Sequence, residues 1–354
     1  MPQKTPFYDI HAAAGASLVD FAGWLMPVQY SGIIEEHGRV RTGAGVFDIG
    51  HMGQIEVFDE DVLQGLTTND IKTLPEGMGQ YSFMCDDNGC VIDDLIVYRL
   101  PDRMLVISNA VNSQKVFNII NVRDPRSTML YGRRTAIAAQ GPLAVGLIGK
   151  ILGSDLSKLK HRQISPVRIF GAYDALASRS GYSGEDGIEI FFDDRAAAEL
   201  WENLVSGGFT PCGLGSRDVL RIEAALPLYG HEIDSSTTPL EAGFGRFIKF
   251  EKGDFSGRQA LSDQKNKGVS KKLVGFELAG RAVPRQGHEI SNGDEIIGSV
   301  TSGTYSPTLK KPIGMAYISM GAAGKEEMPA KISIRDRSFD VSFVSLPFYR
   351  RIKL

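Results

Sequence analysis

Apolar and polar residues follow two different periods along this chain, which predicts a mixture of helices and strands. Runs with helical spacing, each ending at glycine, cover residues 33–45, 143–153 and 195–208. Short runs rich in strand-favouring residues cover 46–59, 103–110 and 135–141. Because these elements do not follow the regular strand–helix–strand rhythm of a parallel sheet, we predict an α+β fold up to about residue 255.

The clearest hairpin lies between residues 80 and 100. Asn88-Gly89 favours a tight turn and separates two runs rich in apolar residues. The second run carries adjacent carboxylates, Asp93 and Asp94. Neighbouring side chains on a strand point to opposite faces, so one acid is expected to face inward, where it needs a partner or a chemical role. The alternative, favoured by these residues alone, is that both acids belong to a solvated turn.

Two helix starts carry local signals. Thr5-Pro6 is expected to supply the N-cap and first-turn proline of a helix that ends at Gly15. Ser216 is expected to cap a helix that begins at Arg217. A helix start beside an arginine suits an anionic group, although an ordinary surface arginine is the alternative.

The last third of the chain changes character. Residues 259–272 are polar and lysine-rich, which favours a linker. Short strand runs with turn signals follow, and no long helix interrupts them, so a small β-barrel or sandwich is expected. We therefore divide the chain into an α+β region, residues 1–262, and a C-terminal domain, residues 272–354.

Composition and charge narrow the functional classes. The 354 residues are 42% hydrophobic and 23% charged, and the net charge of −3 gives no basic excess for nucleic acid. The N-terminus lacks a signal-peptide pattern, and no run of about 18 apolar residues suits a membrane span. The spacing of the three cysteines matches no known zinc-binding or redox motif, so we expect reduced thiols and a cytoplasmic protein.

Two further segments are too polar for plain core. Residues 179–189, RSGYSGEDGIE, contain glycines that permit close backbone approach, the ring of Tyr182, and Glu189, whose carboxylate can accept paired N–H donors. An ordinary glycine-rich hairpin is an equal alternative. Residues 301–309 carry many hydroxyls and form either a ligand-binding loop or a satisfied turn.

Several common enzyme classes are disfavoured. The six histidines have no metal-ligand spacing, and His51 and Met52 are expected in the interior or lining a pocket. The chain lacks a full dinucleotide-binding motif, a phosphate-binding loop and a serine-nucleophile motif. Metal hydrolases, serine hydrolases and NAD dehydrogenases are therefore poor candidates.

Eight segments, in this order, resemble the aminomethyltransferase family of the glycine cleavage system. They are DFAGWLMPVQY, VFDIGHMGQI, VIDDLIVYRL, SGYSGEDGIEI, GLGSRDVLRIEA, LYGHEID, TTPLEAG and VTSGTYSPTL. The resemblance covers nearly the whole chain and implies three domains around a folate cavity, two of them intertwined in residues 1–262. It implies transfer of an aminomethyl carbon from the lipoylated carrier H-protein to tetrahydrofolate, giving 5,10-methylenetetrahydrofolate and ammonia. A monomer without metal, nucleic-acid partner or membrane contact is expected.

The resemblance also assigns roles to single residues. Asp94 falls on the essential aspartate of the family, Glu189 where the family holds the pterin ring, and Arg217 where it binds the glutamate tail of folate. Pocket positions fall on Tyr182, Tyr81, Tyr98, Asn109 and Met52. A carboxylate suits the donor row of a pterin edge, and a guanidinium suits a carboxylate tail. A carboxylate beside N5 of the folate can orient this nitrogen and stabilise positive charge developing on it.

This chain departs from the family pattern at several places. Gly50 stands where the family usually has serine, and Cys90 where it usually has glycine. Two alternatives share the folate pocket: a demethylase with another methyl donor, and a non-enzymatic iron–sulfur maintenance protein. The latter carries a KGCYxGQE signature where this chain has RSGYSGEDG.

A basic cluster near the C-terminus offers a partner hypothesis. Because lipoyl carriers of this system are generally acidic, a basic rim at the pocket entrance is expected to receive the carrier. Its candidate residues are Lys310, Lys311, Arg350, Arg351 and Lys353. A solvated charged tail is the alternative.

Overall fold

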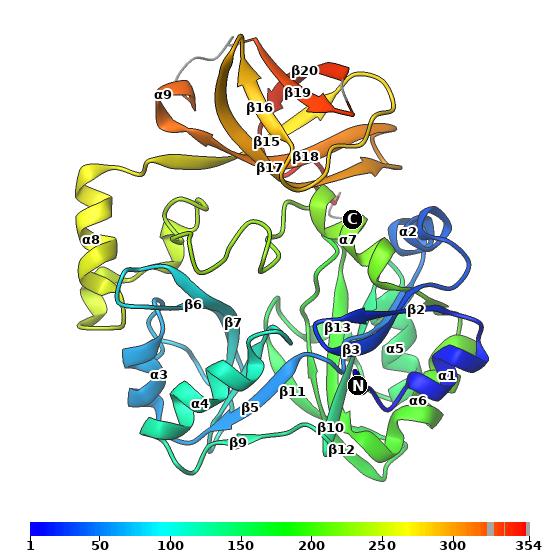
Figure 1. Ribbon diagram of the computed structural model, residues 1–354. Helices are drawn as coiled ribbons and strands as arrows, with labels where there is room; N and C mark the ends of the chain where they lie inside the picture. Colours follow the sequence, from blue (N-terminus) through cyan, green and yellow to red (C-terminus); the bar gives the residue numbers. More distant parts are fainter. Residues whose placement is uncertain (324–328, 336, 352–354) are drawn as a thin grey trace. The chain divides into compact units, whose positions relative to one another are not determined.

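The computed structural model describes residues 1–323, 329–335 and 337–351, which fall into two compact units (Figure 1). The first unit comprises Met1–Ser82 and Asp94–Asp218, and the second comprises Phe83–Asp93 and Val219–Leu354. Each unit is therefore assembled from separate stretches of chain. The predicted domain division between residues 262 and 272 stays a prediction.

The first unit contains a six-stranded sheet with the strand order β11-β12-β13-β10-β4-β14. Its strands are β4 (Gly45–Asp48), β10 (Arg134–Gln140), β11 (Ile164–Ile169), β12 (Tyr173–Ser178), β13 (Gly187–Asp193) and β14 (Thr210–Pro211). All pairs are antiparallel except β14 with β4. The helices α5 (Ala144–Leu152) and α6 (Ala197–Ser206) bury Ile148 and Trp201 in the same apolar core as Phe192 of β13. A mainly antiparallel sheet with packed helices confirms the α+β prediction.

A five-stranded sheet with the order β6-β7-β8-β5-β9 carries the predicted hairpin. Its strands are β5 (Gly53–Val57), β6 (Gly79–Cys85), β7 (Val91–Arg99), β8 (Met104–Ser108) and β9 (Thr128–Met129). The helices α3 (Glu60–Leu66) and α4 (Ser113–Arg123) pack against each other, and α4 packs on β5. Gly89 adopts a φ of 79°, which the Asn88-Gly89 turn requires. Asp93 and Asp94 lie inside β7, so the solvated-turn alternative is wrong.

The N-terminal segment forms a small sheet with the order β1-β3-β2 and two helices. Its elements are β1 (Gln3–Lys4), α1 (Tyr8–Ala13), β2 (Ser17–Phe21), β3 (Trp24–Gln29) and α2 (Ile33–Thr42). The predicted cap at Thr5 is wrong, because α1 has no side-chain cap bond at its start. Thr5 instead donates its hydroxyl to Asp48 at 2.6 Å, a partner 43 residues away.

The predicted start of α7 (Leu214–Glu223) at Arg217 is also wrong, because the helix begins at Leu214. Ser216 therefore lies in the first turn, where its hydroxyl is 2.9 Å from the carbonyl of Gly213 and 3.1 Å from Glu36. The buried Glu36 carboxylate also accepts the backbone N–H of Gly213 at 2.9 Å. A tertiary partner thus satisfies the start of this helix in place of a local cap.

The second unit ends in a closed barrel with the order β15-β18-β17-β16-β19-β20 (Figure 1). Its strands are β15 (Lys271–Leu278), β16 (Glu289–Asn292), β17 (Glu295–Ser306), β18 (Lys311–Ser319), β19 (Ala330–Ile334) and β20 (Arg337–Val344), with α9 (Met320–Ala323) after β18. The predicted C-terminal β-barrel is confirmed. The predicted linker is wrong in its first part, because α8 (Arg258–Lys267) is a helix. Gln, Ala, Leu and Lys favour helices, and Leu261 is fully buried beside Gly89.

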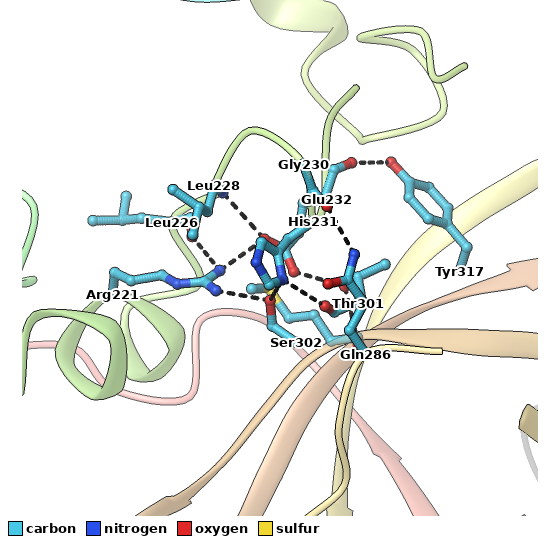
Figure 2. A network of polar contacts seen from close by, with 11 residues as sticks. Arg221, Leu226, Leu228, Gly230, His231, Glu232, Gln286, Thr301, Ser302 and Tyr317 are labelled. Carbon is cyan, nitrogen blue, oxygen red and sulfur yellow. Dashed lines mark hydrogen bonds and ion pairs between the residues drawn. The ribbon is translucent and has the colours of Figure 1, made fainter. Parts of the chain in front are cut away.

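A buried ion pair joins α7 to the chain that follows it, and both of its partners also form hydrogen bonds with the barrel within the second unit (Figure 2). Arg221 donates to Glu232 at 2.7 Å and to Ser302 at 2.8 Å. Thr301 donates to the second oxygen of Glu232 at 2.6 Å, and Tyr317 donates to its backbone carbonyl at 2.7 Å. This part of segment 301–309 is therefore a satisfied structural contact. Among the described residues, no helix has the length and apolar character needed to cross a membrane.

Candidate functional site

All eight residues predicted to form the site lie in the first unit. They are Met52, Tyr81, Asp94, Tyr98, Asn109, Tyr182, Glu189 and Arg217. Hydrogen bonds and a cation–π contact join most of them into two clusters, one around Asp94 and one around Glu189. The strand β7 contributes to both, because Asp94 and Tyr98 are four residues apart on the same strand and therefore on the same face, about 13 Å from each other.

The Asp94 carboxylate is held by two neutral donors. Tyr81 on β6 donates its hydroxyl to one oxygen at 2.8 Å, and Asn109, just after β8, donates its amide to the other at 2.6 Å. Burial raises the pKa of Asp94, whereas these hydrogen bonds lower it. No described residue forms an ion pair with this carboxylate. Asp94 is therefore oriented but not neutralised, and its charge is available to a cationic group.

The Glu189 carboxylate ends a series of hydroxyl groups. Ser180 donates to Glu189 at 2.5 Å, Tyr98 donates to Ser180 at 3.2 Å, and Ser178 donates to Tyr98 at 3.0 Å. Ser178 lies directly opposite Glu189 in the register of β12 with β13. Burial raises the pKa of Glu189, while the Ser180 hydrogen bond and the charge of Arg217 lower it.

The guanidinium of Arg217 interacts with the charge of Glu189 and lies over the ring of Tyr182. Its guanidinium carbon is 4.9 Å from the centre of the Tyr182 ring, and its charge interacts with Glu189 and Asp48. No hydrogen bond or ion pair joins its side chain to any of the described residues. Burial lowers the pKa of Arg217, although a guanidinium keeps its charge in proteins. A buried acid and a cation with free donors can together bind a polar ligand that has both donors and acceptors.

The glycine-rich loop between β12 and β13 is fixed by polar contacts. Arg179 donates to both oxygens of Asp186 at 3.1 and 2.6 Å. Ser183 donates to the Gln140 side chain at 2.6 Å, and Gln140 donates to the carbonyl of Ser180 at 3.1 Å. A Cβ atom at Gly181 would come within 2.0 Å of the Gln140 side-chain oxygen, so a larger residue there would displace this side chain from its hydrogen bonds. The loop thus holds Ser180 and Tyr182 in place.

His51, which the sequence placed in the interior or lining a pocket, is buried. The side chain is 2% exposed, and its Nδ1 has no hydrogen-bond partner among the described residues. Burial, helped by the charge of Arg217, lowers the pKa of His51 to about 4, so the ring is neutral at pH 7. It packs edge-on against Phe21, with ring centres 5.7 Å apart. Met52, the next residue, is half-buried.

Gly50 and Cys90, the two departures from the family pattern, lie in different surroundings. A Cβ atom at Gly50 would lie 2.4 Å from the hydroxyl oxygen of Thr135, so a serine there would require Thr135 to move. Cys90 is half-buried, its backbone N–H donates to Asp86 at 2.9 Å, and all three cysteines are free thiols. Among the described residues, no group of three or more His, Cys, Asp or Glu side chains is arranged to hold a metal ion.

The basic cluster near the C-terminus belongs to the second unit. Lys311 forms an ion pair with Glu277 at 2.8 Å. Lys310, Arg350 and Arg351 belong to the second unit, while Lys353 lies outside the described residues. The proposed rim stays a prediction.

The structure thus defines an α+β protein with a C-terminal barrel, in which hydroxyl and amide groups hold the half-buried Asp94 and the buried Glu189. Two family models match the chain: the GCVT N-terminal domain over residues 7–252 and the glycine cleavage T-protein C-terminal barrel domain over residues 271–350. The aminomethyltransferase of Bacillus mycoides is 43% identical over 99% of both chains. That of Symbiobacterium thermophilum is 44% identical over 98% of this chain and 97% of the relative.

A solved structure agrees with these matches. The glycine cleavage system aminomethyltransferase T from Bartonella henselae superimposes with a TM-score of 0.93 at 33% identity, covering 100% of both chains. The chain therefore belongs to the glycine cleavage T-protein family and is an aminomethyltransferase, as the sequence predicted. These matches give no support to the demethylase or the iron–sulfur maintenance alternative.

Proposed function

We propose that this chain moves the aminomethyl carbon from a lipoylated carrier, the H-protein, to tetrahydrofolate. N5 and N10 of the folate form bonds to this carbon, and its bonds to nitrogen and sulfur break. One of the two protons from N5 and N10 goes to the leaving amino group, which departs as ammonia, and the other goes to the sulfur, which becomes the dihydrolipoyl thiol. Tetrahydrofolate is a substrate of this reaction, and no metal is required by it. The observation that carries the proposal is the combination of the half-buried Asp94 carboxylate, the buried Glu189 carboxylate and the guanidinium of Arg217 in one unit.

Asp94 is proposed to act on the reacting nitrogen of the folate. Its oxygens are fixed by Tyr81 and Asn109, so they can orient N5 without reorganisation. Because both partners are neutral, the carboxylate can stabilise positive charge that develops on nitrogen. Proton abstraction is not needed for this role.

Glu189, Tyr182, Arg217 and Met52 are proposed to bind the folate. One oxygen of Glu189 is occupied by Ser180, and its remaining acceptor sites suit the donors of a pterin edge. The resemblance gives Arg217 the glutamate tail, whereas its closeness to Glu189 and Tyr182 favours an oxygen of the pterin ring. Binding of tetrahydrofolate and of tetrahydropteroate, which lacks the tail, to Arg217→Met decides between them. A tail contact weakens only the first, whereas a ring contact weakens both.

Ammonia release tests the proposed reaction. Purified protein is mixed with tetrahydrofolate and an aminomethylated lipoyl carrier, and ammonia is measured over time. Asp94→Asn is expected to lower turnover by about 100-fold or more, since one preorganised electrostatic contact is removed. Asp87→Asn, an exposed acid in the same hairpin, serves as the control. Full activity in Asp94→Asn would contradict the assignment.

The remaining parts of the proposal have separate tests. Tight folate binding without ammonia release would favour the maintenance alternative, and consumption of an N-methyl donor would favour the demethylase. We also propose that the protein is a cytoplasmic monomer. Sedimentation and cell fractionation test these two points, and a stable dimer or a membrane-bound fraction would contradict them.

A further inference from the structure

We infer that Ser180, supported by Tyr98 and Ser178, is a positioning residue that fixes the orientation of the Glu189 carboxylate for its ligand. The inference rests on the proposed function, because the ligand in question is the folate. It gives Tyr98 a different role from the pocket contact that the family resemblance implies. Tyr98 would act on the ligand only through Ser180 and Glu189.

The direction of the hydroxyl series is set by its final acceptor. An ionised carboxylate can only accept, so Ser180 must use its single proton to donate to Glu189. Tyr98 must then donate to Ser180, and Ser178 to Tyr98. Each hydroxyl therefore has one allowed orientation. One Glu189 oxygen is held by this series, which leaves the other free for donors of the ligand.

Tyr98 is enclosed by protein in a way that excludes direct ligand contact. Its side chain is fully buried, and its ring lies 6.1 Å from that of Phe191. A Cβ atom at Gly79 would come within 2.4 Å of the ring, so the backbone of β6 packs directly on it. Only the hydroxyl is engaged by polar groups, and both of its partners are serines.

The charged groups around Glu189 make the arrangement sensitive to pH. The charge of Arg217, on α7, interacts with Glu189, and Asp48 and Tyr182 interact with Arg217 in turn. The charge of Arg162 interacts with the hydroxyl of Tyr98. On the neighbouring strand β10 the residue opposite Glu189 is the apolar Ala138. Since the Ser180 hydrogen bond lowers the pKa of Glu189 against the effect of burial, losing it raises that pKa. A larger share of Glu189 is then neutral and presents a proton to the donor edge of the ligand.

The experiment measures tetrahydrofolate affinity of the full chain between pH 5 and 8 by calorimetry. Ser180→Ala is expected to weaken binding about ten-fold at pH 7 and to move the acidic limb of the affinity profile to higher pH. Ser180→Thr keeps a hydroxyl and is expected to match the parent protein. Tyr98→Phe is expected to change both quantities less, in the same direction. The folate's own titration is common to all variants and cancels in the comparison.

The double variant separates the indirect role of Tyr98 from a direct one. If Tyr98 acts only through Ser180, Tyr98→Phe adds nothing to Ser180→Ala. If the affinity losses of the two single variants multiply in the double variant, Tyr98 makes an independent ligand contact and the inference is wrong. A loss of affinity in Ser180→Ala that is equal at every pH would also overturn the inference, because a purely structural effect does not move the profile. Tyr173→Phe, a half-buried tyrosine outside the series, is the matched control.

Failure of the inference is distinguishable from failure of the proposed function. If the parent protein binds tetrahydrofolate and releases ammonia while Ser180→Ala behaves identically, only the inference falls. If the parent protein neither binds the folate nor releases ammonia, both fall. Circular dichroism and thermal unfolding confirm that each variant is folded, and Tyr98→Phe, which is expected to shift the profile in the same direction, keeps the test valid if the alanine variant is unstable.

Discussion

Replacing Gly50 by serine tests how this chain accommodates its departure from the family. A Cβ atom at this buried position would lie 2.4 Å from the Thr135 hydroxyl oxygen and 3.1 Å from an oxygen of Asp48. Gly50 does not have a positive φ, so the penalty is steric rather than conformational. Thr135 is 1% exposed within β10 and would have to move by roughly 1 Å. Such overpacking costs about 1–3 kcal/mol, a large part of a stability of about 5–15 kcal/mol.

Denaturant unfolding followed by tryptophan fluorescence is the suitable assay. Both tryptophans, Trp24 and Trp201, lie in the first unit together with Gly50, so fluorescence reports the unit that carries the change. Gly50→Ser is expected to lower the free energy of unfolding by about 2 kcal/mol. Thermal melting of the whole chain would mix two units and is less informative.

Substitutions at Thr135 identify the cause. Thr135→Ala removes the oxygen in the clash and is expected to restore most of the stability lost in Gly50→Ser. Thr135→Val keeps the volume and is expected to restore none. The Thr135 hydroxyl has no hydrogen-bond partner among the described residues, so neither change breaks a hydrogen bond. Equal effects of Gly50→Ser in the Thr, Ala and Val backgrounds would refute the steric explanation.

Two further predictions concern buried ionisable side chains. Because folding lowers the pKa of His51 from 6.5 to about 4, the unfolded chain takes up this proton first as the pH falls. The free energy of unfolding is therefore unaffected by His51 above pH 6.5 and falls by roughly 3 kcal/mol between pH 6.5 and 4. Urea unfolding of His51→Gln at pH 7 and pH 5 is expected to show a smaller loss of stability on acidification than the parent protein. An equal loss in both proteins would contradict the prediction. Arg221→Met leaves Glu232 charged and buried, so it is expected to lower the free energy of unfolding by about 3–5 kcal/mol, measured by circular dichroism. The double variant Arg221→Met/Glu232→Gln is expected to recover part of this loss, and no recovery would contradict the charge explanation.

Local sequence patterns predicted most elements of the fold correctly. The Asn88-Gly89 hairpin, the helices α5 and α6 and the strands of the C-terminal barrel follow from turn residues and apolar periodicity. These signals act over a few residues, so the sequence displays them directly. The errors at Thr5, Ser216 and residues 259–267 have the opposite cause. There, distant partners such as Asp48 and Glu36, or burial of Leu261, decided the structure.

The site shows the same division between local and distant determinants. Polar segments drew attention to the neighbourhoods of Asp94, Glu189 and Arg217, and the family resemblance selected these three residues as candidates. Only the tertiary structure joined Tyr98 to Ser180, 82 positions away, and left Nδ1 of His51 without a hydrogen-bond partner in the described part of the chain. Hydrogen bonds between strands of different sheets depend on how the sheets pack, which periodicity along the chain does not encode. The sequence therefore determined which groups are present, and the packing of two sheets determined which groups act together.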